Sequence, residues 1–124
     1  MKRKIELNTR PKTIICDIDG VLLAHANKGL SVQLEQPILF RTLEKITEWD
    51  SKGYNIILIT GRRESQREET IKQLQLNDIF YDKLIMGVGG GDRVLINDRK
   101  PGSQRDTAYS INLNRNEGVK DVKI

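Results

Sequence analysis

The stretch Thr13-Ile14-Ile15-Cys16-Asp17-Ile18-Asp19-Gly20 joins an apolar, β-branched run to two carboxylates and a glycine. The run from Thr13 to Ile18 predicts a buried strand. Asp17 and Asp19 leave the end of this strand two positions apart, so both can approach one divalent cation. Oxygen ligands of this kind suit Mg²⁺, which leaves coordination positions for phosphate oxygens. A D-x-D-G string is also typical of surface turns, so the rest of the chain must decide between the two interpretations.

Length and composition predict one domain over residues 1–124. The chain is 37% hydrophobic and 31% charged, which is typical of a globular protein. No apolar run reaches the roughly 18 residues that cross a bilayer, so no membrane association is expected. Cys16 is the single cysteine, which excludes an internal disulfide and predicts a buried core residue in a cytoplasmic protein.

The formal net charge of +4 favours an anionic substrate. Nucleic acid as the main partner is not favoured, because the basic residues are spread along the chain and aromatic residues make up only 5%.

Strand and helix signals alternate along the chain, which predicts a Rossmann-like parallel sheet flanked by helices in three layers. A stripe that ends at Trp49 marks the first helix, and Trp49 is expected in the core. Residues 107–113 are expected to form a further strand or a short helix plus strand, and residues 114–124 an exposed end. The other expected elements are strand 13–18, helix 38–52, strand 54–60, surface helix 64–76, strand 83–86 and strand 94–96.

Polar clusters follow three of these expected strands. They are Asp17 with Asp19, the run Thr60-Gly61-Arg62, and Asn97 with Asp98. In open parallel sheets, ligands bind outside the carboxyl ends of the strands. The three clusters are therefore predicted to converge on one crevice, which favours a site over a turn.

With these motifs the chain resembles the haloacid dehalogenase (HAD) superfamily of Mg²⁺-dependent aspartyl phosphatases, as a small member without a cap. The resemblance spans a core of about residues 12–113. It implies that Asp17 is the nucleophile, that Asp19 is the general acid/base and that Thr60 binds the phosphoryl group. It also implies that Mg²⁺ is held by the Asp17 carboxylate, the Asp19 backbone carbonyl and the Asp98 carboxylate. Asn97 replaces the first of two acids common in the family, which would weaken the metal site.

The family also places a cation beside the phosphoryl group, often a Lys just after the third strand. Here the run Gly87–Gly91 has no cation and is expected to be a tight turn near the crevice. Lys83 is the first candidate for the catalytic cation, and Arg93 and Lys100 are the alternatives.

Residues next to the second motif are candidates for binding substrate. Gly61 and Arg62 are assigned that role because the fork of an arginine matches the paired oxygens of a phosphate. Arg63 is the alternative to Arg62, and whichever does not face substrate is expected to be solvated or paired with a nearby glutamate. His25, in the expected flap, is expected at the surface, with contact to the substrate as the alternative.

The intervals between motifs leave room for a small flap at about residues 22–36 but for no cap domain. For a member without a cap, the resemblance implies an open site that takes a large substrate or gains a lid from a neighbouring subunit in a homo-oligomer. The expected function is a Mg²⁺-dependent phosphomonoesterase acting through an aspartyl-phosphate on a phosphorylated sugar, a nucleic acid end or another bulky phosphate. The alternative is a catalytically weak domain that binds a phosphorylated ligand or partner protein, which Asn97 and the missing Lys after Gly87 motivate.

Overall fold

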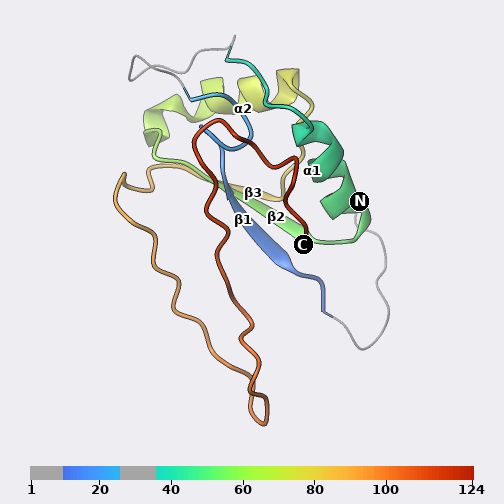
Figure 1. The fold of residues 1–124 in the computed structure, drawn as a ribbon. Coiled ribbons are helices and arrows are strands. Elements are labelled where there is room, and N and C mark those ends of the chain that lie inside the picture. The colour runs from blue at the N-terminus through green and yellow to red at the C-terminus, as the bar shows by residue number, and fades with distance from the viewer. Residues whose placement is uncertain (1–9, 26–35) are drawn as a thin grey trace.

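A computed structural model describes residues 10–25 and 36–124, which form one parallel sheet flanked by helices (Figure 1). The strand order is β1-β2-β3, and each strand is parallel to its neighbour. This arrangement confirms the expected α/β fold, and no cap is evident among the residues that the structure describes. The strands are β1 (Thr13–Asp17), β2 (Asn55–Ile59) and β3 (Lys83–Ile85), and they are joined by α1 (Thr42–Ser51), then by the 3₁₀ turn Glu64–Gln66 with α2 (Arg67–Leu76).

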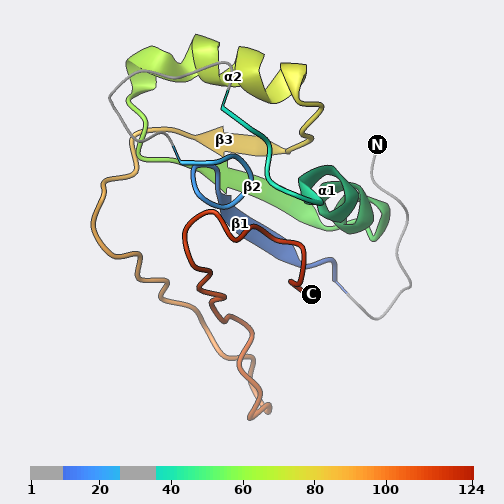
Figure 2. The ribbon, with the colours of Figure 1, turned by 45° about the horizontal axis from the view of Figure 1, so that its top comes forward.

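Side chains alternate between the two faces of the sheet. Ile14, Cys16 and Leu58 lie on one face and are buried together with Trp49 of α1 and Leu74 of α2. The burial of Cys16 and Trp49 confirms their expected place in the core. On the opposite face, Ile15 and Ile85 keep 51% and 44% of their surface exposed. In Figure 2, α2 lies beyond β3, and the C-terminal residues lie on the side of β1.

Helix α1 begins four residues later than the apolar stripe predicts. Before it, the backbone N–H of Leu39 donates to the carbonyl of Leu22 at 3.0 Å, and the N–H of Ala24 donates to the carbonyl of Pro37 at 2.8 Å. These bonds hold the chain before α1 against the segment that follows β1, so it cannot join the helix. Leu22 is fully buried, which makes the start of the predicted flap part of the core. The rest of the flap, residues 26–35, lies outside the described residues.

The C-terminal segment packs against the body, so its expectation as an exposed end was wrong. Val119 and Val122 are buried in the same core as the helices. Lys45 on α1 donates from Nζ to the carbonyl of Val122 at 2.8 Å, and the Tyr54 hydroxyl donates to the carbonyl of Ile124 at 3.4 Å. The burial of Val119 and Val122 therefore anchors residues 114–124, whose composition had suggested only an exposed end.

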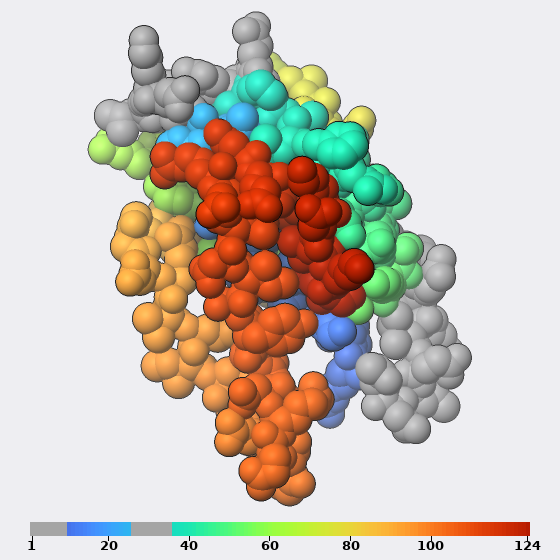
Figure 3. Space-filling model, viewed as in Figure 1, coloured from blue at the N-terminus to red at the C-terminus, as the bar shows by residue number. Residues whose placement is uncertain are grey.

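The expected fourth strand is absent from the described part of the chain. Residues 94–112 instead project from the body as an extended excursion, here called the arm (Figures 1 and 3). Val94 and Ile96 are 82% and 93% exposed, and the run 107–113 forms neither the expected strand nor a helix. An apolar run indicates that a segment is suited to a strand, but the strand forms only when the segment pairs with the edge of a sheet.

Candidate active site

The carboxyl ends of β1 and β2 open into a cavity of about 590 Å³. Loops at this edge of a parallel sheet form the usual ligand crevice. The first two polar clusters converge here as expected. The predicted site residues that line the cavity are Asp17, Asp19, Thr60, Gly61 and Arg62.

Asp17 ends β1 and presents its carboxylate to the cavity, with 44% of the side chain exposed. The guanidinium of Arg93, at the start of the arm, lies 3.6 Å from Asp17 Oδ1. At this distance the two groups form an ion pair, but they are too far apart for a good hydrogen bond. A ligand entering the cavity can therefore reach Asp17 with a positive charge already beside it.

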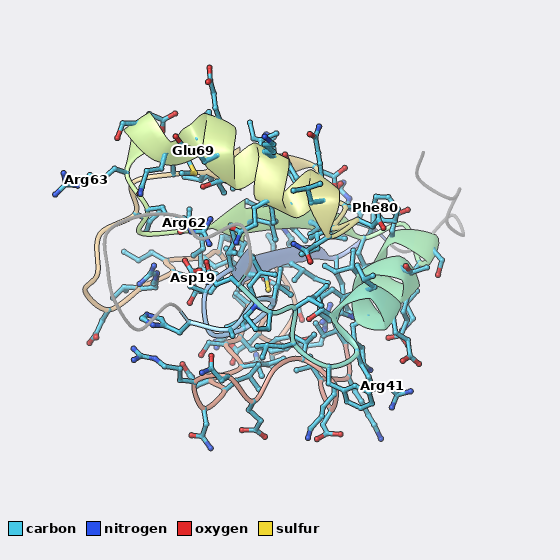
Figure 4. The ribbon with its side chains drawn as sticks, turned by 90° about the horizontal axis from the view of Figure 1, so that it is seen from above. Asp19, Arg41, Arg62, Arg63, Glu69 and Phe80 are labelled. Carbon is cyan, nitrogen blue, oxygen red and sulfur yellow. The ribbon has the colours of Figure 1, made fainter. Side chains whose placement is uncertain are left out.

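Asp19, by contrast, has its carboxylate engaged by its neighbours. Arg62 donates from Nε to Oδ2 at 3.0 Å and from Nη2 to Oδ1 at 2.7 Å, and Gln36 donates to Oδ1 at 2.8 Å. The two bonds from Arg62 form a bidentate pair, the strong geometry for a guanidinium and a carboxylate. Figure 4 shows Arg62 and Asp19 facing each other beneath α2. Asp19 is thus a fixed carboxylate within the cavity wall.

The guanidinium of Arg62 is held in turn by α2. Its Nη1 donates to Thr70 Oγ1 at 3.1 Å and to Gln73 Oε1 at 2.7 Å, and only 9% of its side chain is exposed. The sequence predicted Arg62 as a substrate-binding residue. In the structure its nitrogens are occupied by protein oxygens, so its geometry suits positioning Asp19 more than capturing a phosphate. Arg63, the alternative, is exposed and lines the cavity.

The environment of Asp19 sets its charge state. Burial alone would raise the pKa of Asp19, but hydrogen bonds from Arg62 and Gln36, with the charge of Arg62, lower that pKa below its ordinary value. Asp19 is therefore ionised at neutral pH and acts as a hydrogen-bond acceptor. Asp17 and Asp19, two positions apart in sequence, occupy unlike surroundings.

Thr60 and Gly61 are fixed against the chain that leaves β3. The buried Thr60 donates its backbone N–H to the carbonyl of Ile85 at 3.0 Å, and its Oγ1 accepts from the N–H of Arg62 at 3.1 Å. A Cβ at position 61 would lie 3.1 Å from the carbonyl oxygen of Val88, a contact that glycine avoids. The Thr60-Gly61-Arg62 turn is therefore held by backbone contacts that a larger residue at position 61 would disturb.

Lys83 is not placed at the site. It begins β3 in register with Ile57, two positions short of the end of β2. Since neighbouring strands are about 4.8 Å apart, β3 lies roughly 10 Å from β1. Of the two alternatives, Arg93 is the residue beside Asp17, whereas Lys100 lies on the arm and does not line the cavity.

Asp98 is also remote from the predicted site. It lies on the arm with Asn97 around a separate hollow of about 260 Å³, where Thr107 donates from Oγ1 to the backbone carbonyl of Asp98 at 2.9 Å. Across residues 10–25 and 36–124, no three His, Cys, Asp or Glu side chains gather as a metal site would require. The predicted ligand set of Asp17, Asp19 and Asp98 is not assembled among the described residues, because Asp98 lies on the arm, away from the cavity.

Several cavity residues escaped sequence reasoning. Gln36 is the last residue of the predicted flap, and Arg115 lies in the segment expected to be an exposed end. The N–H of Asn116 donates to the carbonyl of Gly20 at 2.9 Å, and Asn116 Oδ1 accepts from the N–H of His25 at 2.8 Å. Both bonds bring distant parts of the chain together, and no local pattern signals them. His25, expected at the surface with substrate contact as the alternative, also lines the cavity.

A family model described as haloacid dehalogenase-like hydrolase matches residues 14–90, which include the first two motifs. The chain belongs to the haloacid dehalogenase-like hydrolases. Membership confirms the resemblance drawn from the motifs and supports a phosphatase-type hydrolase. No helix among the described residues of this HAD-like hydrolase is long and apolar enough to cross a membrane.

Two solved chains share the fold of this HAD-like hydrolase. One comes from a structure of a Pnkp1/Rnl/Hen1 complex, with 28% identity and a TM-score of 0.57, over 70% of this chain and 31% of that chain. The other comes from a structure of the Pnkp1/Rnl/Hen1 RNA repair complex, with 26% identity and a TM-score of 0.56, over 74% and 30%. The HAD-like chain thus spans about a third of the length of each. Comparison with curated proteins gave no match.

Proposed function

We propose that this HAD-like hydrolase is a phosphomonoesterase that forms an aspartyl-phosphate on Asp17. The unequal surroundings of the two carboxylates carry this proposal. Asp17 is exposed to the cavity beside Arg93, whereas Asp19 is bound on both oxygens by Arg62. Paired acids whose environments differ take different roles in catalysis.

In the first step, a carboxylate oxygen of Asp17 attacks the phosphorus atom, the bond from phosphorus to the leaving oxygen breaks, and the leaving oxygen takes up a proton from solvent. Water then attacks the acyl phosphate, which releases inorganic phosphate and restores Asp17. Asp19, held ionised by Arg62, is suited to accept the proton of that water. The backbone of the Thr60-Gly61-Arg62 turn and the guanidinium of Arg93 line the cavity where the phosphoryl oxygens would lie.

The family resemblance also implies Mg²⁺, which would supply positive charge at the phosphoryl group. The described residues do not assemble the predicted ligand set, because Asp98, which would supply its second carboxylate, lies at a separate hollow away from Asp17 and Asp19. The steps above therefore use no metal. We propose Mg²⁺ dependence only together with a further carboxylate at the cavity.

Arg93, rather than Lys83, is proposed as the cation that faces the phosphoryl group. Arg93→Ala is expected to lower kcat/KM for an aryl phosphate roughly a hundredfold, the usual effect of losing one charge-stabilising group. The free energy of unfolding should change by less than about 1 kcal/mol, because an exposed ion pair contributes little to stability. Steady-state kinetics and urea unfolding measure the two effects.

Lys83→Ala is the matched control for this prediction. Lys83 is an exposed cation on the same sheet but outside the cavity. Lys83→Ala should leave kcat/KM within about threefold of the value for the unchanged protein, because substitutions at exposed positions away from a site usually have small effects. A large loss in Lys83→Ala, with Arg93→Ala unaffected, would reverse the assignment.

We propose the phosphorylated end of a nucleic acid strand as the substrate class. The two similar solved chains belong to a complex described as acting in RNA repair, and the cavity is lined by Arg63, Arg93 and Arg115. Such arginines suit the phosphates that flank a strand end. The composition alone did not favour nucleic acid, since it does not show where the basic residues gather.

Release of inorganic phosphate from a panel of compounds tests this function. The panel holds an aryl phosphate, a hexose phosphate and oligonucleotides phosphorylated at the 5′ or the 3′ end, each with and without Mg²⁺. One phosphorylated oligonucleotide should have the highest kcat/KM, and the value should fall as salt rises. Tight binding of an oligonucleotide without phosphate release from any compound would instead favour the catalytically weak binding domain.

A further inference from the structure

Arg115 brings a further positive charge to the cavity. It lines the same cavity as Asp17 and lies on an exposed turn of the C-terminal segment. The guanidinium groups of Arg93 and Arg62 are paired with the carboxylates of the site. Within the described part of the chain, no acidic side chain forms an ion pair with Arg115. Its charge is therefore open to an anion that enters the cavity.

The turn that presents Arg115 has a fixed backbone. The N–H of Glu117 donates to the carbonyl of Asn114 at 3.1 Å, which closes the turn. Asn116 has a φ of 66°, a left-handed conformation that asparagine adopts more readily than most residues. The N–H of Asn116 also donates to the carbonyl of Gly20 at 2.9 Å. The turn is thus anchored to the loop that leaves β1.

The stem of the Arg115 side chain packs on the same loop. A Cβ at Gly20 would lie 3.5 Å from Cγ of Arg115, which is van der Waals distance. On the other side of the turn, a Cβ at Gly118 would lie 3.3 Å from Cβ of Leu39, so the backbone there packs closely as well. Figures 1 and 2 show the C-terminal segment beside the loop that follows β1. A backbone that is fixed before a ligand arrives lowers the entropy cost of binding.

The cavity has room for more than the reacting phosphate. Its volume of about 590 Å³ lies within the range of pockets that enclose a drug-sized ligand. In a nucleic acid strand, the terminal phosphate is followed by a phosphodiester with one negative charge and two free oxygens. The paired N–H groups of a guanidinium match such oxygens. Arg115 shares the cavity with Asp17 but comes from another segment, so it is suited to this second anion.

We propose that Arg115 is a specificity-determining residue, which binds the phosphodiester that follows the terminal phosphate of a nucleic acid strand. This role rests on the proposed function, in which Asp17 takes the terminal phosphate. A strand end is then preferred to a mononucleotide because of the charge of its second phosphate. Contacts to phosphates carry no sequence information, so the preference does not depend on the base.

Calorimetry with the Asp17→Asn protein tests this role, because that variant binds a substrate without consuming it. Three ligands are compared, phosphorylated at the 5′ end in one series and at the 3′ end in another. They are thymidine monophosphate, dithymidine phosphate, and the same dithymidine with a neutral methylphosphonate linkage. In at least one series the charged dithymidine should bind about tenfold more tightly than the other two, the scale of one hydrogen bond to a charged group.

Adding Arg115→Ala should remove this advantage, so that the charged and neutral linkages bind alike. The neutral linkage also tests the charge of the diester without any change to the protein. Lys123→Ala is the matched control, since Lys123 is an exposed cation on the same C-terminal segment but outside the cavity. This control should keep the full advantage.

Two results would overturn the proposal. One is equal binding, or no binding, of the charged and neutral dithymidines by the protein with Arg115 intact. The other is an advantage that survives Arg115→Ala, or that is lost in Arg63→Ala instead. The proposed function fails separately: a charge-dependent advantage in binding, with no phosphate release by the unchanged protein from any compound of the panel, would refute the phosphomonoesterase and support the anion subsite.

Discussion

Replacing Asp17 with Asn is expected to reduce phosphate release at least about 10⁴-fold, the scale seen when a nucleophile is removed. The amide matches the carboxylate in shape but cannot attack phosphorus to form the acyl phosphate. Asp17 is exposed and makes only a long ion pair with Arg93, so the substitution should leave the fold and the free energy of unfolding nearly unchanged. The measurement is phosphate release from the best compound of the panel, with enzyme in excess over substrate to detect a single turnover.

Asp121→Asn is the control for this substitution, because Asp121 is an exposed aspartate outside the cavity. It should retain the rate of the unchanged protein. Asp17→Asn should still bind an inorganic phosphate mimic, which would distinguish a lost nucleophile from a lost binding site. Turnover by Asp17→Asn within tenfold of the original would rule out an aspartyl-phosphate at this position.

Replacing Arg62 with Met is expected to lower the free energy of unfolding by about 3 kcal/mol, since it leaves a largely buried carboxylate without its partner. Methionine fills much of the volume of arginine but offers no donor to Asp19, Thr70 or Gln73. Urea unfolding followed by circular dichroism measures the change. Arg63→Met is the matched control and should change stability by no more than about 0.5 kcal/mol, because Arg63 is an exposed neighbour.

The pH dependence of the stability lost in Arg62→Met shows whether the carboxylate of Asp19 is the group that Arg62 stabilises. The pKa of Asp19 is lowered in the folded protein, so the ion pair stabilises the fold at neutral pH. This contribution is present above the unfolded value of about 4 and is lost as pH falls through the lowered pKa of Asp19. The stability difference between the original protein and Arg62→Met should therefore be largest near pH 7 and vanish in strong acid. A difference that is constant with pH would mean that Arg62 acts through packing.

Kinetics separate positioning from substrate binding. If Arg62 orients Asp19, then Arg62→Met should lower kcat more than it raises KM. Arg62→Lys should restore little, because an ammonium group cannot make the two parallel bonds to Asp19. A rise in KM with kcat unchanged would return Arg62 to the substrate-binding role that its place in the sequence suggested.

The sequence determined those features that depend on neighbours along the chain. Apolar runs followed by polar turns predicted β1 and β2, and the parallel order followed from the helices between them. The same local logic located Asp17, Asp19 and Thr60 at one edge of the sheet, since every parallel strand presents its carboxyl end there. It also identified Cys16 and Trp49 as core residues, because each lies on the apolar face of its element.

The tertiary structure decided which side chains pair across that edge. The position of Arg62 in the sequence is compatible with a side chain that faces the substrate or one that faces Asp19. In the folded chain, Thr70 and Gln73 of α2 hold the guanidinium where it binds Asp19. Local sequence favoured Lys83 over Arg93 as the cation. In the structure, strand register places Lys83 two strands away from β1, and the chain that leaves β3 brings Arg93 to Asp17. Val94–Ile96 suits a strand, yet among the described residues this run pairs with no strand and stays exposed. Asp17 and Asp19 could thus be found from local sequence, whereas the charges around them depend on contacts between distant segments, which composition and periodicity do not encode.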